Sequence, residues 1–232
     1  MAAARGARIV IATGDEISGF ELAAETGAEC WAGDLTLAHS ADSVLAQCLS
    51  KFGRVDGLFN VAGLSGRRYG DGPVHEIQDD AWHTTLSHNL TVAFRMCRAV
   101  AGRMLEQEGG GTIVNMGSVL VDAPEPRHFA THAYAAAKGA IAAMTKSMAA
   151  YYAPRGIRVN LIAPGLVRTP AGERSNVDPA FQEFVRKKQP LNSGMIEVAD
   201  VARAAVFLLS EESRSITGEV FTIDGGWRLS GV

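Results

Sequence analysis

The chain has 232 residues, enough to bury one sizeable core, and 47% of them are hydrophobic and 20% charged. This composition is typical of a soluble globular protein. The formal net charge of −3 gives no reason to expect nucleic acid or an anionic membrane as a partner, and no apolar run is long enough to span a bilayer.

The cysteines and the first residues indicate a compartment. Cys30, Cys48 and Cys97 form no close pair and lie in apolar stretches, so we expect buried, reduced thiols. No apolar signal core follows the arginines of residues 1–8, and we therefore expect a cytoplasmic protein. His128 and His132 have a spacing that can bind a metal, but no carboxylate or cysteine stands at a matching spacing, so we assign no metal.

Short apolar runs alternate with longer amphipathic ones along the chain. The pattern predicts strands over residues 8–12, 29–33, 57–61, 112–116, 157–162 and 219–223, and helices over residues 17–26, 38–52, 80–107 and 133–152. Strands that alternate with helices and are apolar on both faces predict one domain over residues 1–232, with a mostly parallel twisted sheet between two helical layers. Residues 166–195 are polar and weakly periodic, and we interpret them as a possible substrate lid.

Polar residues follow the predicted strands, where ligands of parallel sheets bind. Tyr134 and Lys138 lie four residues apart on a predicted helix, so they share one face. A tyrosine hydroxyl has an ordinary pKa of about 10, and a nearby ammonium lowers that pKa toward the range useful for acid–base catalysis. Ser118 follows the fourth strand and could hydrogen-bond a substrate carbonyl. Alone, the pair is most simply a solvated helix pair. With Ser118 after one strand and Asn60-Val61-Ala62-Gly63 after another, a catalytic site is the better interpretation.

These residues, in this order, make the chain resemble the short-chain dehydrogenase/reductase family. The resemblance covers nearly the whole chain from Gly6 onward. It implies a Rossmann-like fold and an NAD(P)-dependent oxidoreductase that interconverts a secondary alcohol and a carbonyl by hydride transfer. The matching pieces are Asp34-Leu35, Asn60-Val61-Ala62-Gly63, Asn89, Ser118, Tyr134 with Lys138, Pro164-Gly165 with Thr169, and Ile223-Asp224-Gly225-Gly226.

The resemblance also implies catalytic roles. Tyr134 is expected to act as the general acid/base, and Lys138 to lower its pKa and hold the nicotinamide ribose. Ser118 is expected to orient the substrate oxygen, and Asn89 to kink its helix and hold a water in a proton relay.

For the cofactor, the resemblance implies three groups of contacts. The adenine would be flanked by Asp34 and Leu35. The nicotinamide would be lined by Pro164, Gly165 and Thr169. The adenosine side would be lined by Asn60, Ala62 and Gly63. Members of the family form homodimers or homotetramers through the two long helices and the last strand, and act on small alcohols and carbonyls.

Two departures from the family pattern lie near the expected site. Residues 124–128 lengthen the spacing between Ser118 and Tyr134, and we expect them to bulge at its mouth. The charged segment from Gly66 to Asp71 could meet an anionic substrate, although a solvated loop is the favoured interpretation.

A third departure is the missing glycine-rich turn that binds the cofactor pyrophosphate. Residues 13–20 could be a degenerate copy, but Phe20 would then block close approach of the backbone. The spacing favours another interpretation: residues 6–11 are the family's second strand, and the first βα unit is missing. In the family that strand lies mid-sheet, so its loss leaves ladder groups unpaired. The sheet could close over the gap, a partner chain could fill it, or the native protein could begin upstream.

Two functional interpretations remain at this point. One is an active oxidoreductase with NAD or NADP, with a slight preference for NAD because Asp15 follows the first strand. The other is a degenerate relative with impaired dinucleotide binding, which serves as a binding or oligomerisation module or transfers protons without hydride. The substrate is not readable from these residues.

Overall fold

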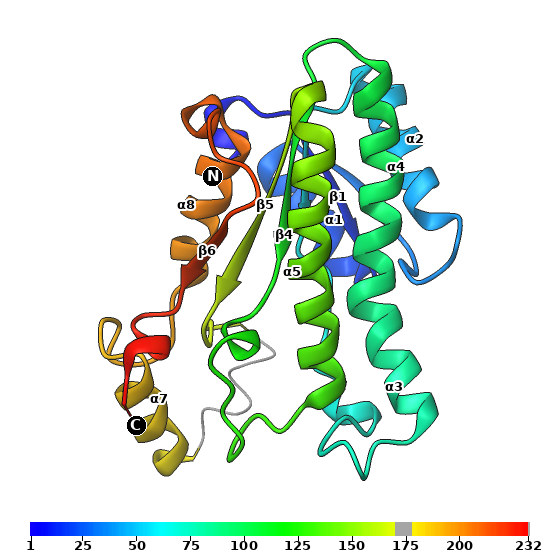
Figure 1. The fold of residues 1–232 in the computed structure, drawn as a ribbon. Coiled ribbons are helices and arrows are strands. Elements are labelled where there is room, and N and C mark those ends of the chain that lie inside the picture. The colour runs from blue at the N-terminus through cyan, green and yellow to red at the C-terminus, as the bar shows by residue number, and fades with distance from the viewer. Residues whose placement is uncertain (170–177, 232) are drawn as a thin grey trace.

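The computed structural model describes residues 1–169 and 178–231. Strands lie between two layers of helices, and α4 and α5 run side by side across one face (Figure 1). All strand pairs are parallel, as the alternation of strands and helices predicts. The strands are β1 (Val10–Thr13), β2 (Glu29–Ala32), β3 (Gly57–Asn60), β4 (Gly111–Met116), β5 (Ile157–Pro164) and β6 (Val220–Ile223).

The strands form two separate sheets. In the described residues β1 pairs with β2 alone, while the other four strands pair in the order β3-β4-β5-β6. Consequently β1 and β3 each have a hydrogen-bonded neighbour on one side only. All four residues of β1 stay partly exposed, whereas the four inner residues of β4 are buried. This break agrees with the prediction that a strand is missing from the middle of the sheet.

Helices on one face of the sheet build the larger part of the core. There α2 (Ser40–Phe52), α4 (Val92–Glu106) and α5 (His132–Tyr152) pack against the strands through side chains such as Met104 and Ile113. On the other face α8 (Val198–Leu209) packs through Ala205 and Leu208. By contrast, α1 (Glu16–Thr26) buries only Gly19 and Ala23 and leaves Ile17 and Phe20 more than half exposed.

The predicted helix over residues 80–107 is interrupted. It consists of α3 (Asp79–Leu86), a π-helical turn (Ser87–Thr91) and α4, and Asn89 lies in the π turn, where the kink was expected. The sequence analysis missed two helices, α7 (Pro179–Lys188) and α8. The start of α7 carries a legible signal, because Asp178 accepts a hydrogen bond from the backbone N–H of Ala180 and proline stands at the first helical position.

The carboxyl ends of the strands converge on one edge of the larger sheet. Asn60 stands opposite Asn115 on β3 and β4, and Met116 stands opposite Ile162 on β4 and β5. The segments that follow β3, β4 and β5 therefore lie side by side, at the lower end of the sheet in Figure 1. The first turn of α5 reaches the same end.

Candidate active site

The serine, tyrosine and lysine predicted to act together are neighbours in space. The Nζ of Lys138 donates a hydrogen bond of 3.0 Å to the carbonyl oxygen of Met116 and lies 5.5 Å from the ring centroid of Tyr134. The Ser118 hydroxyl interacts with the Tyr134 hydroxyl and accepts a bond of 3.2 Å from the backbone N–H of Leu120. The end of β4 and the first two turns of α5 thus build one cluster.

Burial decides the protonation of this cluster. Burial raises the pKa of Tyr134, and the Ser118 hydroxyl offsets part of the rise. Burial also lowers the pKa of Lys138 to about 8, because its side chain is almost completely enclosed. Burial is thus the largest cause of the net rise in the Tyr134 pKa, a contribution that the i, i+4 spacing with Lys138 does not contain. Tyr134 keeps its proton at neutral pH and can donate it.

Asn89 holds the chain that follows β3 against this cluster. Its buried side chain donates to the carbonyl oxygens of Leu64 (3.0 Å) and Thr85 (2.8 Å) and accepts from the Leu64 N–H (3.2 Å). A Cβ atom on Gly63 would lie 2.6 Å from the Asn89 Oδ1 and 3.5 Å from the Lys138 Nζ. Only glycine fits so close an approach, so Gly63 lies directly beside the cluster of Ser118, Tyr134 and Lys138, while Ala62 is exposed next to it.

Asn60 has its side chain in the protein interior. Its Nδ2 donates to the Asn115 Oδ1 (2.8 Å) and contacts the Cys97 Sγ (3.2 Å). Asn115 in turn donates to the Thr145 Oγ1 (2.9 Å). These bonds tie β3, β4 and α5 together, so any contact of Asn60 with a cofactor falls to its backbone. Burial raises the pKa of Cys97 to about 12, which keeps this thiol neutral, and the three cysteines are free.

The residues expected to flank the adenine lie after β2. Asp34 is exposed and accepts hydrogen bonds from the Thr36 N–H (2.8 Å) and hydroxyl (2.6 Å), which lower its pKa. Leu35 packs against the core instead of standing free. Asp15 caps α1: its carboxylate accepts from the Ser18 N–H (3.2 Å) and hydroxyl (2.8 Å), and these bonds lower its pKa.

The turn after β5 is clamped by a residue that the sequence analysis missed. Gln189 is fully buried and bonds both the N–H (2.6 Å) and the carbonyl oxygen (3.1 Å) of Leu166. A Cβ atom on Gly165 would lie 2.2 Å from the Gln189 Oε1, so glycine is required there. Pro164 is the last residue of β5, and Thr169 follows it in the described part of the chain. Residues 170–177 of the predicted lid lie outside the described residues.

The lengthened loop before Tyr134 packs onto the protein. Glu125 is buried and accepts from the backbone N–H groups of Arg127 (3.2 Å) and His128 (2.6 Å). The ring of His128 lies 4.4 Å from that of Phe184 on α7. The loop and α7 thus pack against each other. Among residues 1–169 and 178–231, no group of three His, Cys, Asp or Glu side chains could hold a metal ion.

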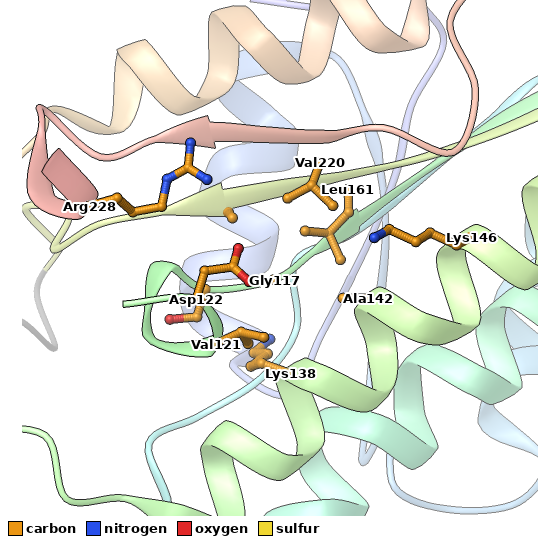
Figure 2. Close-up of a pocket in the computed structure, with 11 residues that line it drawn as sticks. Gly117, Val121, Asp122, Lys138, Ala142, Lys146, Leu161, Val220 and Arg228 are labelled. Atoms are coloured by element: carbon orange, nitrogen blue, oxygen red, sulfur yellow. The ribbon is translucent and has the colours of Figure 1, made fainter. Parts of the chain in front are cut away.

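A cavity of about 160 Å³ adjoins Ser118 and Lys138 between α5, β5 and β6 (Figure 2). Lys146 and Arg228 line its outer part. Pockets for small ligands usually measure about 300–1,000 Å³, so this cavity is too small for a dinucleotide. A cofactor would have to lie along the carboxyl edge of the sheet instead.

Two observations bear on where a dinucleotide could lie. Gly63 stands beside buried Lys138, the residue expected to hold the nicotinamide ribose. A pyrophosphate is normally bound by a glycine turn and a helix N-terminus after a mid-sheet strand. Between β1 and β3 the described residues contain no such strand.

A family model described as enoyl-(acyl carrier protein) reductase matches residues 1–228. The chain belongs to the short-chain dehydrogenase/reductase family. Proteins of this type are oxidoreductases that act on CH–OH and C=O groups with NAD(P), and the observed Rossmann-like fold is theirs.

Relatives of this short-chain dehydrogenase/reductase carry different substrate names. "Inactive 2-(S)-hydroxypropyl-CoM dehydrogenase 2" of Xanthobacter autotrophicus is 36% identical and matches 95% of each chain. D-threitol dehydrogenase of Mycolicibacterium smegmatis is 35% identical over 98% of this chain and 85% of its own. A solved structure from Sinorhizobium meliloti 1021, described as a presumed short-chain alcohol dehydrogenase, is 29% identical with a TM-score of 0.88, over 98% of this chain and 89% of its own.

These matches show the family of the chain but do not identify its substrate. The names share dehydrogenase chemistry and differ in the substrate.

In the part of the chain that the structure describes, no helix is long and apolar enough to cross a membrane.

Proposed function

We propose that this chain interconverts a secondary alcohol and a carbonyl, with Ser118, Tyr134 and Lys138 as its catalytic set. The observation that carries the proposal is their convergence at one edge of the sheet, with Gly63 and Asn89 packed against them. Reduction of a carbonyl to an alcohol needs a proton donor at the substrate oxygen. Tyr134 keeps its proton at neutral pH, because burial raises its pKa.

The three residues have separable tasks. Tyr134 gives its proton to the carbonyl oxygen during reduction and takes it back during oxidation. Ser118, already in contact with the Tyr134 hydroxyl, holds the substrate oxygen in reach of that proton. Lys138 supplies positive charge beside the ring and binds ribose hydroxyls. A bound nicotinamide cofactor would supply the hydride.

We propose NAD rather than NADP as the cofactor. Asp15 ends the loop after β1 with an exposed carboxylate whose pKa is lowered by Ser18. A carboxylate at this place accepts hydrogen bonds from ribose hydroxyls and repels a phosphate. Replacement of Asp15 by Arg is expected to shift the preference toward NADP, measured as the ratio of the two dissociation constants.

A second candidate function follows from the divided sheet. Without a strand between β1 and β3, the pyrophosphate lacks its usual backbone donors, so dinucleotide binding would be weak or lost. One relative, which matches 95% of this chain and 95% of its own length, carries the word inactive in its name. Such a protein would serve as a binding or oligomerisation module, or move protons without hydride.

One titration separates the two candidates. NADH and NADPH are added to the protein, and the change in their fluorescence is followed, with Lys138→Met as a matched variant. Saturable binding that Lys138→Met weakens supports the oxidoreductase. No binding at millimolar cofactor supports the second candidate.

We also propose a homodimer or homotetramer formed through α4 and α5. Apolar side chains of α4 stay exposed: Phe94 is 45% exposed and Leu105 37%. Paired long helices would cover them. Light scattering tests this, and a monomer would refute it.

A further inference from the structure

The first turn of α5 is capped by a residue from a distant part of the chain. Helix starts leave backbone N–H groups without partners, and a side chain at the N-cap usually accepts one of them. Here the N-cap Thr131 makes no such bond. Instead the two carboxylate oxygens of Asp71 accept from the N–H groups of Ala133 and Tyr134, each at 3.0 Å. The carbonyl oxygen of Gly72 accepts from the His132 N–H at 3.2 Å.

Asp71 is buried, and its two hydrogen bonds to the start of α5 are therefore shielded from water. Asp71 is only 6% exposed, and no lysine or arginine among the described residues forms an ion pair with it. A buried carboxylate needs hydrogen bonds and opposite charge, and the N-terminal end of a helix offers both. The segment from Gly66 to Asp71, interpreted from sequence as a solvated loop, therefore ends in an anchor. Within it, residues 67–70 are exposed, whereas Gly66 and Asp71 are buried.

The 64–74 segment connects this anchor to Asn89. At its start, Leu64 is bonded through both its N–H and its carbonyl oxygen to the Asn89 side chain. In its middle, a Cβ atom on Gly66 would lie 2.1 Å from the Thr85 Oγ1, so the segment lies tightly on α3. At its end, the Val74 N–H donates to the His132 Nδ1 at 3.0 Å. The segment thus spans from the π turn to the first turn of α5.

We infer that Asp71 is a positioning residue, which holds the first turn of α5 at the height that places Tyr134 against Ser118 and Lys138. This inference rests on the proposed function, since that function gives Tyr134 its task. Tyr134 is the third residue of its helix, where helices fray unless their N–H groups are bonded. A misplacement of about 1 Å at a reacting group can lower a rate by about 100-fold.

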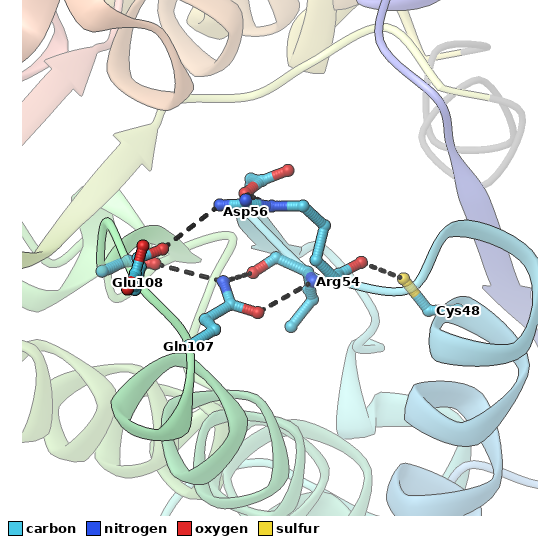
Figure 3. A network of polar contacts seen from close by, with 7 residues as sticks. Cys48, Arg54, Asp56, Gln107 and Glu108 are labelled. Atoms are coloured by element: carbon cyan, nitrogen blue, oxygen red, sulfur yellow. Dashed lines mark hydrogen bonds and ion pairs between the residues drawn. The ribbon is translucent and has the colours of Figure 1, made fainter.

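The experiment compares Asp71→Ala and Asp71→Asn with a matched control. The control is Gln107→Ala, which lies between the end of α4 and the start of β4 and so at the opposite end of the sheet from Tyr134. Its contacts are shown in Figure 3. The Gln107 side chain bonds the N–H (3.3 Å) and carbonyl oxygen (2.6 Å) of Val55 and the carbonyl oxygen of Gly110 (3.3 Å), so its loss also frees backbone groups, three in this case. Each protein is labelled with fluorotyrosine and its phenols are titrated by fluorine NMR. Tyr134→Phe assigns the Tyr134 signal among the four tyrosines.

The expected results separate positioning from charge and from stability. In Asp71→Ala the first turn loosens, the Tyr134 hydroxyl gains water, and its titration midpoint falls by about one pH unit or more. Asp71→Asn has no charge but keeps one acceptor, so it restores at least half of the shift. Gln107→Ala leaves the midpoint unchanged. Equal shifts in Asp71→Ala and Asp71→Asn, or no shift in either, would overturn the inference.

Kinetics then distinguish the inference from the function on which it rests. Where the parent reduces a carbonyl, Asp71→Ala is expected to lower kcat at least tenfold and leave the KM for the cofactor within twofold, with partial rescue by Asp71→Asn. If Asp71→Ala lowers the titration midpoint of Tyr134 but the parent reduces no carbonyl, the inference is supported and the proposed function is refuted. If Asp71→Ala keeps the parental kcat and the parental titration midpoint of Tyr134, the inference is overturned and the proposed function stands.

Discussion

The Asn60 side chain donates a hydrogen bond of 2.8 Å to the Oδ1 of Asn115, directly opposite it on the neighbouring strand. Both side chains are buried, and the Asn115 Nδ2 passes the link on to Thr145 of α5. The end of β3, from which Gly63 is reached, is thereby held at a fixed distance from the helix of Tyr134 and Lys138.

Loss of this bond is expected to weaken the fold. In Asn60→Ala the buried Asn115 Oδ1 loses its closest donor, which costs about 1–3 kcal/mol. Urea denaturation of the two proteins measures the difference. Asn192→Ala, at an exposed position, is the control and is expected to change the free energy of unfolding by less than about 0.5 kcal/mol. Equal effects of the two substitutions would contradict a structural role for the network.

Lys138 is expected to make the fold more stable as the pH rises. Below pH 8 its amine is protonated in both folded and unfolded chains, so the folded state is destabilised by the full cost of burying the charge. Between about 8 and 10.5 the unfolded chain binds a proton that the folded one does not, and the free energy of unfolding therefore increases with pH.

The matching variant is Lys138→Met. It is expected to be more stable than the parent at pH 7 by about 1–3 kcal/mol, after allowance for the lost bond to Met116. That advantage shrinks as the pH approaches 10. Urea titrations at both ends of this range measure it. An advantage that does not vary with pH would show that the Lys138 amine is not desolvated.

The divided sheet is expected to show in amide hydrogen exchange. Backbone groups on the unpaired edges of β1 and β3 lack a partner strand, while β4 is bonded on both sides. The least protected amides of β1 and β3 are expected to exchange at least about 100-fold faster than those of β4. Equal protection in all three strands would mean that the gap is closed in solution.

Local patterns account for what the sequence revealed. Parallel strands, the Tyr134–Lys138 spacing and the kink at Asn89 are properties of short segments or of one helix face, and the structure has them. The break between the sheets was also predictable, because a missing strand changes the spacing of all later elements.

Distant contacts account for what it did not reveal. Asp71 reaches Tyr134 across 63 residues, and Gln189 reaches Leu166 across 23, so no local pattern marks either. The packing of the Asn60 and Leu35 side chains toward the protein interior has a similar reason: burial among other elements, not chain position, decides where those side chains point. The rise in the Tyr134 pKa likewise depends on packing that the i, i+4 spacing does not contain.

The most direct test of the account is the rate of carbonyl reduction by Tyr134→Phe, followed as the loss of NADH absorbance. Tyr151→Phe, exposed on the same helix, is the control. General acid catalysis contributes about 100- to 10,000-fold, so Tyr134→Phe is predicted to be at least about 100-fold slower than the parent, and Tyr151→Phe unchanged. A correctly folded Tyr134→Phe protein that kept the full parental rate would contradict the assignment of Tyr134 as the proton donor.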